Sequence, residues 1–451
     1  MNLSDPYAIS TDTIVDPPIK LSERIKYLGP GFILSASIVG SGELIATTTL
    51  GAKAGFITFW VIIASCLIKV FVQMEFTKHT ILNGKTAMSL ISELGYAGQK
   101  RYKWPVWSML VMMLVKFVQI GGIVGGVAII LSIAVPELPE AAWSYAIALV
   151  VGLIVFKGYY KLIEGTSIVL MGLFTVFTAC CLVFTFYTPY SFDFGDILAG
   201  LTFELPKELV PVAIGAFGIT GMSGEEILYY NYWCLEKGYA RSCGPRDNSN
   251  EWKKRARGWI NMMQMDALVS MCIYTVVTAI FYLLGASILH VQGKVPEGYA
   301  MIQTLSAIYT ESLGGWARPV FLIGSFFILF STLFAALASW TRLFPDIFSE
   351  LGWVNFRDAH QRNKLIKILA FFFPLSWATL FVFIELPVIM IISGGIIGSV
   401  MLLLVIAATV NFRLKPLDGY FNSTRTYTLL FWSNVVLIFL FSLYGLLKLF
   451  L

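Results

Sequence analysis

The chain has 451 residues, of which 57% are hydrophobic and 13% charged, and its mean hydropathy is +0.76. A soluble globular protein carries about 25% charged residues, so the composition excludes that class and indicates a polytopic integral membrane protein. The net charge of +5 is modest and gives no reason to expect a nucleic acid as partner. The sequence contains no nucleotide-binding, hydrolase or metalloenzyme motif, so we expect neither an enzyme nor a bound cofactor.

Eleven stretches are long and apolar enough to cross a bilayer, since a spanning helix needs at least about 17 such residues. They are expected at 28–50, 55–76, 104–133, 141–157, 164–188, 208–233, 261–288, 318–341, 365–384, 386–411 and 427–450. The predicted fold class is therefore an all-α polytopic membrane protein with eleven transmembrane helices. Residues 1–27 lack the features of a signal peptide and are expected to form a soluble tail.

Lysine and arginine gather in alternate loops, which indicates the orientation through the positive-inside rule. Placing residues 1–27 in the cytoplasm puts most of the 32 basic residues on that side. The basic residues expected outside are Lys53, Lys207, Lys294, Arg318 and Lys448. An odd number of spans then places the C-terminus outside, and we expect a protein of the bacterial inner membrane in this orientation.

The first span is interrupted near its middle by Gly-Ser-Gly-Glu at residues 40–43, and the sixth by Gly-Met-Ser-Gly-Glu-Glu at residues 221–226. Glycine weakens a helix and serine accepts hydrogen bonds from free backbone N–H groups, so each interruption predicts two half-helices with an unwound joint. At bilayer depth such a joint is tolerated only inside the protein or beside a cavity. The two joints therefore predict a binding site.

Spans one to five (28–188) and six to ten (208–411) are expected to form two inverted repeats, with the eleventh span (427–451) added. A pseudo-two-fold axis between the repeats would bring Glu43 and Glu225 into one central volume. The residues predicted to bind the substrate are Gly40, Ser41, Gly42, Glu43, Met222, Ser223, Gly224 and Glu225.

Ionisable side chains inside spans are costly and usually functional. The carboxylates of Glu43 and Glu225 predict coordination of a hard cation, or uptake of a proton, with Met222 as a third metal ligand. The alternative is a structural role: each carboxylate opens a half-helix whose free N–H groups favour a negative charge, and Met222 only packs.

Glu226 lies about 100° around a helix from Glu225, so it is expected to point away from the site and to pair with Lys69 or Lys116. Each lysine is either such a counter-ion or a side chain that reaches the interface, and the central position of Lys116 in its span favours the counter-ion. A lysine beside a cation site would oppose cation binding. The aromatic residues that follow the joint are expected in an interfacial belt: Tyr229, Tyr230, Tyr232 and Trp233.

The chain resembles the Nramp family of divalent metal transporters. The resemblance rests on Gly-Pro-Gly at 29–31, Gly-Ala-Lys-Ala-Gly at 51–55, Asn-Gly-Lys at 83–85 and the eleven-span plan. It is strongest in the first hundred residues and extends loosely over most of the chain. It implies the inverted-repeat, LeuT-like fold of the amino-acid/sodium symporters, with broken helices one and six and alternating access about them.

The chain departs from the motifs that carry function in that family. The family has Asp-Pro-Gly-Asn in span one, where this chain has Gly-Ser-Gly-Glu at 40–43. It has Met-Pro-His in span six, where this chain keeps only Met222 before Ser223 and Gly224. The family's acidic pair in span three has no counterpart within 116–128. Transition-metal selectivity and proton coupling therefore do not follow from the resemblance.

We expect a secondary transporter of a small cation in the lipid bilayer, and oxygen ligands favour a hard ion such as Mg²⁺ or Mn²⁺. The alternative is a carrier of a small organic solute on the same scaffold, with the glutamates binding hydroxyl or ammonium groups. A membrane sensor that transports nothing is disfavoured, because the chain shows no appended soluble domain.

Overall fold

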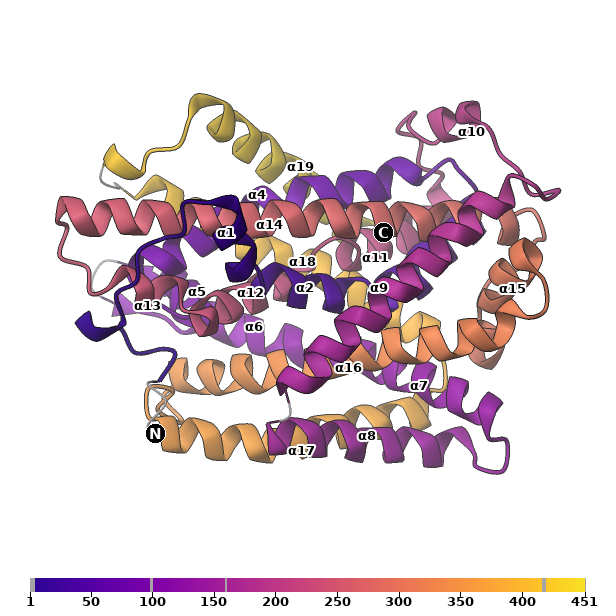
Figure 1. Cartoon of the computed structure of the whole chain (residues 1–451), viewed down its shortest axis with the longest axis horizontal. Coiled ribbons are helices and arrows are strands. Elements are labelled where there is room, and N and C mark those ends of the chain that lie inside the picture. The colour runs from indigo at the N-terminus through magenta and orange to yellow at the C-terminus, as the bar shows by residue number, and fades with distance from the viewer. Residues whose placement is uncertain (1–4, 98–99, 159, 416–418, 451) are drawn as a thin grey trace.

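Long helices that run side by side along the molecule dominate the computed structural model, which describes residues 5–97, 100–158, 160–415 and 419–450 (Figure 1). The only strands within these ranges are β1 (Tyr96–Ala97) and β2 (Lys100–Arg101), which pair antiparallel. Nearly all backbone hydrogen bonds are thus made within helices, as a bilayer requires.

The helices of the predicted first half follow the expected spans closely. They are α2 (Pro30–Ile38), the π-helical turn η2 (Gly42–Thr47), α3 (Thr48–Ala54), α4 (Phe59–Asn83), α6 (Trp104–Val115), α7 (Phe117–Ala134), α8 (Glu140–Lys157) and α9 (Tyr160–Thr185).

The helices of the predicted second half and of the last span come next in the chain. They are α11 (Val210–Ile219), α12 (Gly224–Lys237), α14 (Asn250–Leu284) with the π-helical turn η5 (Gly285–Leu289), α16 (Ala317–Glu350), α17 (Ala359–Ile384), α18 (Pro387–Leu414) and α19 (Arg425–Phe450).

Short helices connect or precede these elements. They are η1 (Thr11–Thr13), α1 (Leu21–Tyr27), α5 (Ala87–Ser92), η3 (Glu93–Gly95), α10 (Phe194–Ala199), η4 (Lys207–Leu209), α13 (Tyr239–Cys243), η6 (Gly298–Ala300), α15 (Met301–Leu313) and η7 (Gly419–Phe421).

Within the described residues, nine helical stretches are long and apolar enough to cross a membrane. The predicted fifth and sixth spans are not among them: the described apolar stretch of α9 is Gly172–Thr185, and α11 and α12 are separate short helices. The outer face of α9 nevertheless exposes apolar side chains at helical spacing: Val169, Leu173, Val176 and Val183. The number eleven stays a prediction.

The predicted break in the first span is present between α2 and η2. Helix α2 ends at Ile38, and the N–H of Gly40 turns to a side chain, the carboxylate of Glu43 (3.3 Å). A Cβ atom at Gly40 would overlap the hydroxyl of Thr332 on α16. The glycine therefore lets the unwound joint lie directly against a neighbouring helix.

The predicted break in the sixth span is present between α11 and α12. Residues 220–223 are not helical, and Gly221 has a φ of +68°, which a side chain would strain. A Cβ atom at Gly221 would lie 2.8 Å from the Cα of Cys66 on α4. Both breaks are therefore packed inside the protein, in agreement with the predicted broken helices one and six.

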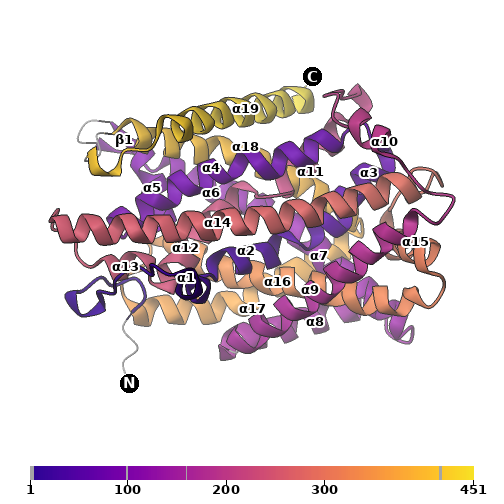
Figure 2. The same ribbon diagram turned by 45° about the horizontal axis from the view of Figure 1, so that its top comes forward.

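The two broken helices pack against each other in the centre of the molecule. Helix α2 contacts α12, and η2 contacts α11. Around them lie α4, α14, α16 and α18, while α8 and α17 run side by side at one edge (Figures 1 and 2). The joints thus occupy the middle of the helical assembly.

Helices α11 and α18 pack backbone against backbone. A Cβ atom at Gly218 would overlap the carbonyl oxygen of Gly395, and one at Gly395 would overlap that of Gly215. Small residues allow this approach in membrane helices, where packing rather than the hydrophobic effect drives association. Glycine at these places is a requirement of the contact.

Replacing Gly218 by alanine is expected to destabilise the protein by about 1–3 kcal/mol, because the added methyl group forces α11 away from α18. The matched control is Gly172→Ala on α9, where a Cβ atom meets nothing within 4 Å. The melting temperatures of the purified proteins in detergent measure the difference. Equal melting temperatures for the two variants would contradict the account of the α11–α18 contact.

Candidate functional site

A small cavity of about 30 Å³ lies where the broken helices meet α7 and α16. Part of its wall is apolar and is formed by Ile38, Ile120, Ile123, Ile219, Ala336 and Trp340. The polar residues of the wall are Ser37, Ser41, Gln119, Glu225, Glu226, Tyr229 and Thr332. Because about 10–15 Å³ of such space holds one water molecule, the cavity has room for an ion or one to two waters, far less than the pocket of a drug-sized organic ligand.

Glu225 lies in the first turn of α12 and pairs with Lys116, which stands between α6 and α7. Both side chains are buried, with exposed fractions of 7% and 1%. The second carboxylate oxygen of Glu225, Oε2, has no hydrogen-bond partner in the described part of the chain. Gly398 of α18 leaves room for the ammonium, because a Cβ atom there would lie 3.2 Å from it. One carboxylate oxygen therefore remains available in the cavity.

Glu226 also lines the cavity, so the prediction that it points away from the site of Glu225 is wrong. Its Oε2 accepts hydrogen bonds from the N–H (2.8 Å) and the hydroxyl (3.0 Å) of Ser223 in a capping box. Its Oε1 lies 3.4 Å from the hydroxyl of Ser37. The prediction failed because the cavity surrounds the end of α12 rather than one face, and side chains about 100° apart both reach it.

Glu43 does not line the cavity, in contrast to the prediction that it meets Glu225 there. Its carboxylate is completely buried and accepts hydrogen bonds from the hydroxyl of Thr278 on α14 (3.0 Å) and from the N–H of Gly40 (3.3 Å). The π-helical turn η2 directs it toward α14. This geometry is that of the helix cap, the structural alternative considered from the sequence.

The other predicted site residues divide between the cavity and its surroundings. Ser41 and Gly42 line it. Gly40, Met222, Ser223 and Gly224 do not: Met222 is completely buried, and a Cβ atom at Gly224 would lie 2.9 Å from the backbone of Leu402. In the described residues no three His, Cys, Asp or Glu side chains gather as a metal site. Of the predicted metal set of Glu43, Glu225 and Met222, Glu225 alone is among the described residues that line the cavity.

Lys69 of α4 does not pair with Glu226 as predicted but serves the end of α11. Its ammonium donates to the backbone carbonyls of Phe217 and Thr220 (3.0 Å to the latter) and to the hydroxyl of Ser65 (2.8 Å). A cation at a helix C-terminus satisfies carbonyl groups that have no partner within the helix and complements the helix dipole. Lys69 therefore stabilises the first half of broken helix six.

Gln119 was not predicted as a site residue from the sequence, and Tyr229 was predicted at the membrane interface. The Oε1 of Gln119 and the hydroxyl of Tyr229 are buried and have no hydrogen-bond partner among the described residues. Tyr229 to Trp233 are buried too, so the predicted interfacial belt is wrong. The signals were present: Gln119 is polar inside an apolar span, one turn after Lys116, and Tyr229 lies one turn after Glu225 on the same helix face.

The cavity thus contains three unpartnered oxygen atoms, on Gln119, Glu225 and Tyr229. Buried polar atoms without partners are rare in proteins, and each costs about 1–3 kcal/mol. A group that supplies positive charge or hydrogen-bond donors would satisfy them. The arrangement is suited to binding a small cationic or donor-bearing substrate.

A model of the Nramp family, described as natural resistance-associated macrophage protein-like, matches residues 31–448. The chain belongs to the Nramp family. Nramp proteins are membrane transporters and not enzymes. The predicted resemblance is confirmed, and it extends over almost the whole chain.

Among curated relatives, this Nramp protein is similar to the divalent metal cation transporter MntH of Caldanaerobacter subterraneus subsp. tengcongensis. The two are 23% identical over 320 residues, which cover 68% of this chain and 69% of the relative.

Solved structures show the same fold. A manganese transporter of Eremococcus coleocola superposes with a TM-score of 0.65 at 14% identity, over 97% of this chain and 90% of that one. Mhp1, a nucleobase-cation-symport-1 family transporter, superposes with a TM-score of 0.56 at 13% identity, over 96% of this chain and 94% of its own. The predicted LeuT-like fold is confirmed.

Replacing Lys69 by methionine is expected to destabilise this Nramp protein by about 1–3 kcal/mol, because the carbonyl groups of Phe217 and Thr220 then share the single hydroxyl proton of Ser65 as their side-chain donor. The control is Lys53→Met, since Lys53 is exposed on α3. Thermal unfolding in detergent measures both. A Lys69 variant as stable as the Lys53 variant would show that α11 does not depend on this ammonium.

Proposed function

We propose that the protein is a secondary-active transporter that moves a small cation, a hard divalent ion such as Mg²⁺ or Mn²⁺, by alternating access. The observation that carries the proposal is the small cavity at the two helix breaks, whose wall includes unpartnered oxygen atoms of Gln119, Glu225 and Tyr229. Sites between broken helices near the membrane midplane are where secondary transporters of this architecture bind their substrates.

The donor atoms of the cavity favour a hard ion. The described residues that line it offer carboxylate, amide and hydroxyl oxygens and no sulfur or imidazole nitrogen. Oxygen ligands suit Mg²⁺, Ca²⁺ and Mn²⁺, whereas softer ligands favour Cu(I) or Zn²⁺. With Met222 outside the cavity, nothing in the wall resembles a site selective for a soft transition metal.

The charge of the cavity requires Lys116 to respond to a divalent ion. Ionised Glu225 and Glu226 supply two negative charges, and Lys116 neutralises one of them. A divalent ion on Oε2 of Glu225 would stand close to the ammonium, and a double and a single positive charge about 4 Å apart repel by about 8 kcal/mol at an effective dielectric constant of 20. We therefore propose that Lys116 is a tethered counter-ion of the empty site and withdraws when the ion binds.

The relatives support the same substrate class. The MntH relative is named a divalent metal cation transporter, and the Eremococcus coleocola protein a manganese transporter. The proposal that the ion is hard rests on the oxygen donors of the cavity.

A carrier of a small organic solute is the second candidate. The ion pair of Lys116 with Glu225 favours it, because a zwitterionic or hydroxylated solute would find both charges in the cavity. Mhp1, of the same fold, holds bromovinylhydantoin. The volume of about 30 Å³ favours the ion, since the wall would have to open by the volume of the solute.

For the arrangement in the cell we propose the orientation indicated by the basic loops. Residues 1–27 lie in the cytoplasm of a bacterial cell, the C-terminus lies outside, and the spans of 28–188 and 208–411 are two inverted repeats in the inner membrane.

Calorimetry of the purified protein with Mg²⁺, Mn²⁺ and Ca²⁺ tests the proposal. Wild type is expected to release or absorb heat with at least one of these ions, and Glu225→Gln to weaken that binding at least tenfold, because the carboxylate loses its charge. Lys116→Met is expected to bind the ion more tightly than wild type, since the competing ammonium is gone.

The control for these variants is Glu208→Gln, which removes an exposed carboxylate ahead of α11 and should leave the affinity unchanged. Uptake of the same ion into proteoliposomes gives a second measurement. Absence of heat and uptake with all three ions would overturn the cation proposal and favour the organic solute, especially if Lys116→Met then abolishes transport.

A further inference from the structure

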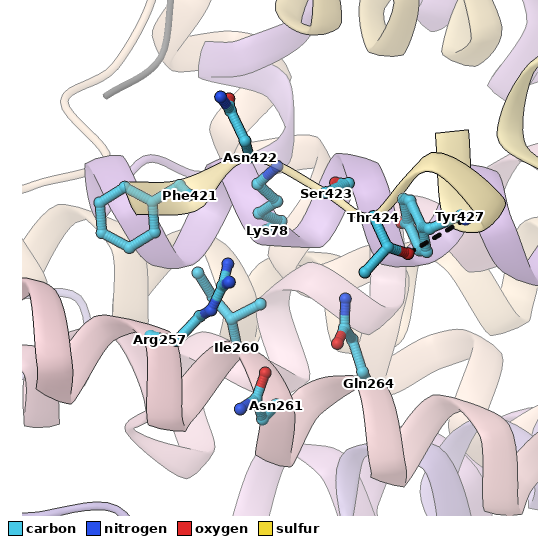
Figure 3. A pocket seen from close by; sticks show the side chains of 10 residues that line it. All are labelled: Lys78, Arg257, Ile260, Asn261, Gln264, Phe421, Asn422, Ser423, Thr424 and Tyr427. Carbon is cyan, nitrogen blue, oxygen red and sulfur yellow. Dashed lines mark hydrogen bonds between the residues drawn. The ribbon is translucent and has the colours of Figure 1, made fainter. Parts of the chain in front are cut away.

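A second hollow, of about 290 Å³, lies at the end of the molecule where α4 ends and α14 begins. Figure 3 shows how it is built: Arg257, Asn261 and Gln264 project from α14 toward the segment that leads into α19, and Lys78 of α4 lies in the space between them. Its volume is at the lower end of the range of about 300–1,000 Å³ found for ligand pockets. The hollow is outside the proposed transport site and shares no residue with it.

The hollow is positively charged. Lys78 and Arg257 line it, and no carboxylate of the described residues does. A neighbouring hollow of about 250 Å³ shares Lys78 and adds Arg413 and Lys415, again without a described carboxylate. Four cations therefore face one connected region of the surface, and one of them, Lys415, is paired with Glu93 (2.6 Å).

A buried carboxylate near these cations, that of Glu75, already forms ion pairs with two of them. Glu75 lies completely buried beneath the hollow and binds Lys78 (3.2 Å) and Arg413 (3.0 Å). Arg257 is half-buried, and no hydrogen bond or ion pair joins its guanidinium to a residue of the described chain. It lies 5.8 Å from the ring of Tyr420. Arg257 is thus held in place with its donors unused by the described residues.

The position of the hollow relative to the lipid-facing surface indicates which part of the membrane it meets. One turn beyond Gln264 on α14, Leu268 is exposed, and just beyond Tyr427 on α19, Leu429 and Leu430 are exposed. Exposed leucines on both helices mark the surface that the lipid tails cover. The hollow therefore lies at the boundary between that surface and water, where phospholipid headgroups are found.

We propose that this hollow binds the phosphate group of an anionic phospholipid. Arg257 donates to the phosphate oxygens in the two-pronged geometry that guanidinium and phosphate share, and Lys78 adds a second positive charge. The amides of Asn261, Gln264 and Asn422 donate to the remaining headgroup oxygens. The proposal is independent of the transported substrate.

The test uses the full chain in detergent and follows its melting temperature with added dioleoylphosphatidylglycerol, dioleoylphosphatidylcholine or inorganic phosphate. Wild type is expected to be stabilised by phosphatidylglycerol at least threefold more than by the zwitterionic lipid. Arg257→Gln is expected to lose at least half of that difference. Lys254→Gln, which removes an exposed charge three residues earlier on α14, is the matched control and should keep it.

A second variant tests the proposal independently if Arg257→Gln fails to fold. Asn261→Asp leaves Arg257 in place but adds a negative charge at the exposed rim, so it should also reduce stabilisation by phosphatidylglycerol. Equal stabilisation of wild type, Arg257→Gln and Asn261→Asp would overturn the proposal. Stabilisation by inorganic phosphate as strong as by the lipid, and lost in Arg257→Gln, would overturn the lipid as the source of the phosphate.

Discussion

The structure depends on satisfying the backbone groups that two helix breaks expose inside the bilayer. Each free N–H or C=O group costs several kcal/mol in a hydrocarbon environment, so every break needs partners from side chains. Glu43 and Glu226 accept from the joints, and Lys69 donates to the end of α11. These buried charges suggested a functional role in the sequence, and in the structure they stabilise the helix breaks.

Because Glu43, Glu226 and Lys69 bind backbone groups at the breaks, fewer polar side chains remain to bind a substrate. Lys116 binds one carboxylate oxygen of Glu225, and the side-chain oxygen atoms of Gln119 and Tyr229 have no hydrogen-bond partner among the described residues. The proposed site is thus defined by polar atoms that have no partner among the described residues rather than by the number of charges near the joints. This distinction moves the centre of the site from Glu43 toward α7 and α12.

Much of the fold followed from composition and pattern. Glycine and serine beside an acidic residue inside an apolar span predicted both breaks, and the breaks and the family resemblance predicted the LeuT-like architecture. The direction of individual side chains did not follow. Glu43 turns away because η2 is a π-helical turn, and Glu226 turns inward because the cavity surrounds a helix end. Neither local geometry is encoded in residue spacing.

The positions that the sequence analysis missed are long-range effects of packing. Lys69 reaches carbonyl groups about 150 residues away in the chain, and Gln119 becomes important only because helices from both halves meet around it. A single sequence shows that such residues are polar and inside a span, which is enough to notice them. It does not show which helix lies opposite.

The direct contact of α11 with α18 bears on how the protein changes conformation. Two backbones that touch at Gly215, Gly218 and Gly395 leave no side chains between them to change rotamer, so this pair resists both separation and tilting. Any rearrangement that opens the cavity first to one side of the membrane and then to the other must carry α11 and α18 together as one rigid block. The sliding surfaces are then those where larger side chains intervene, such as the face that α12 presents to α16 through Tyr229 and Trp340.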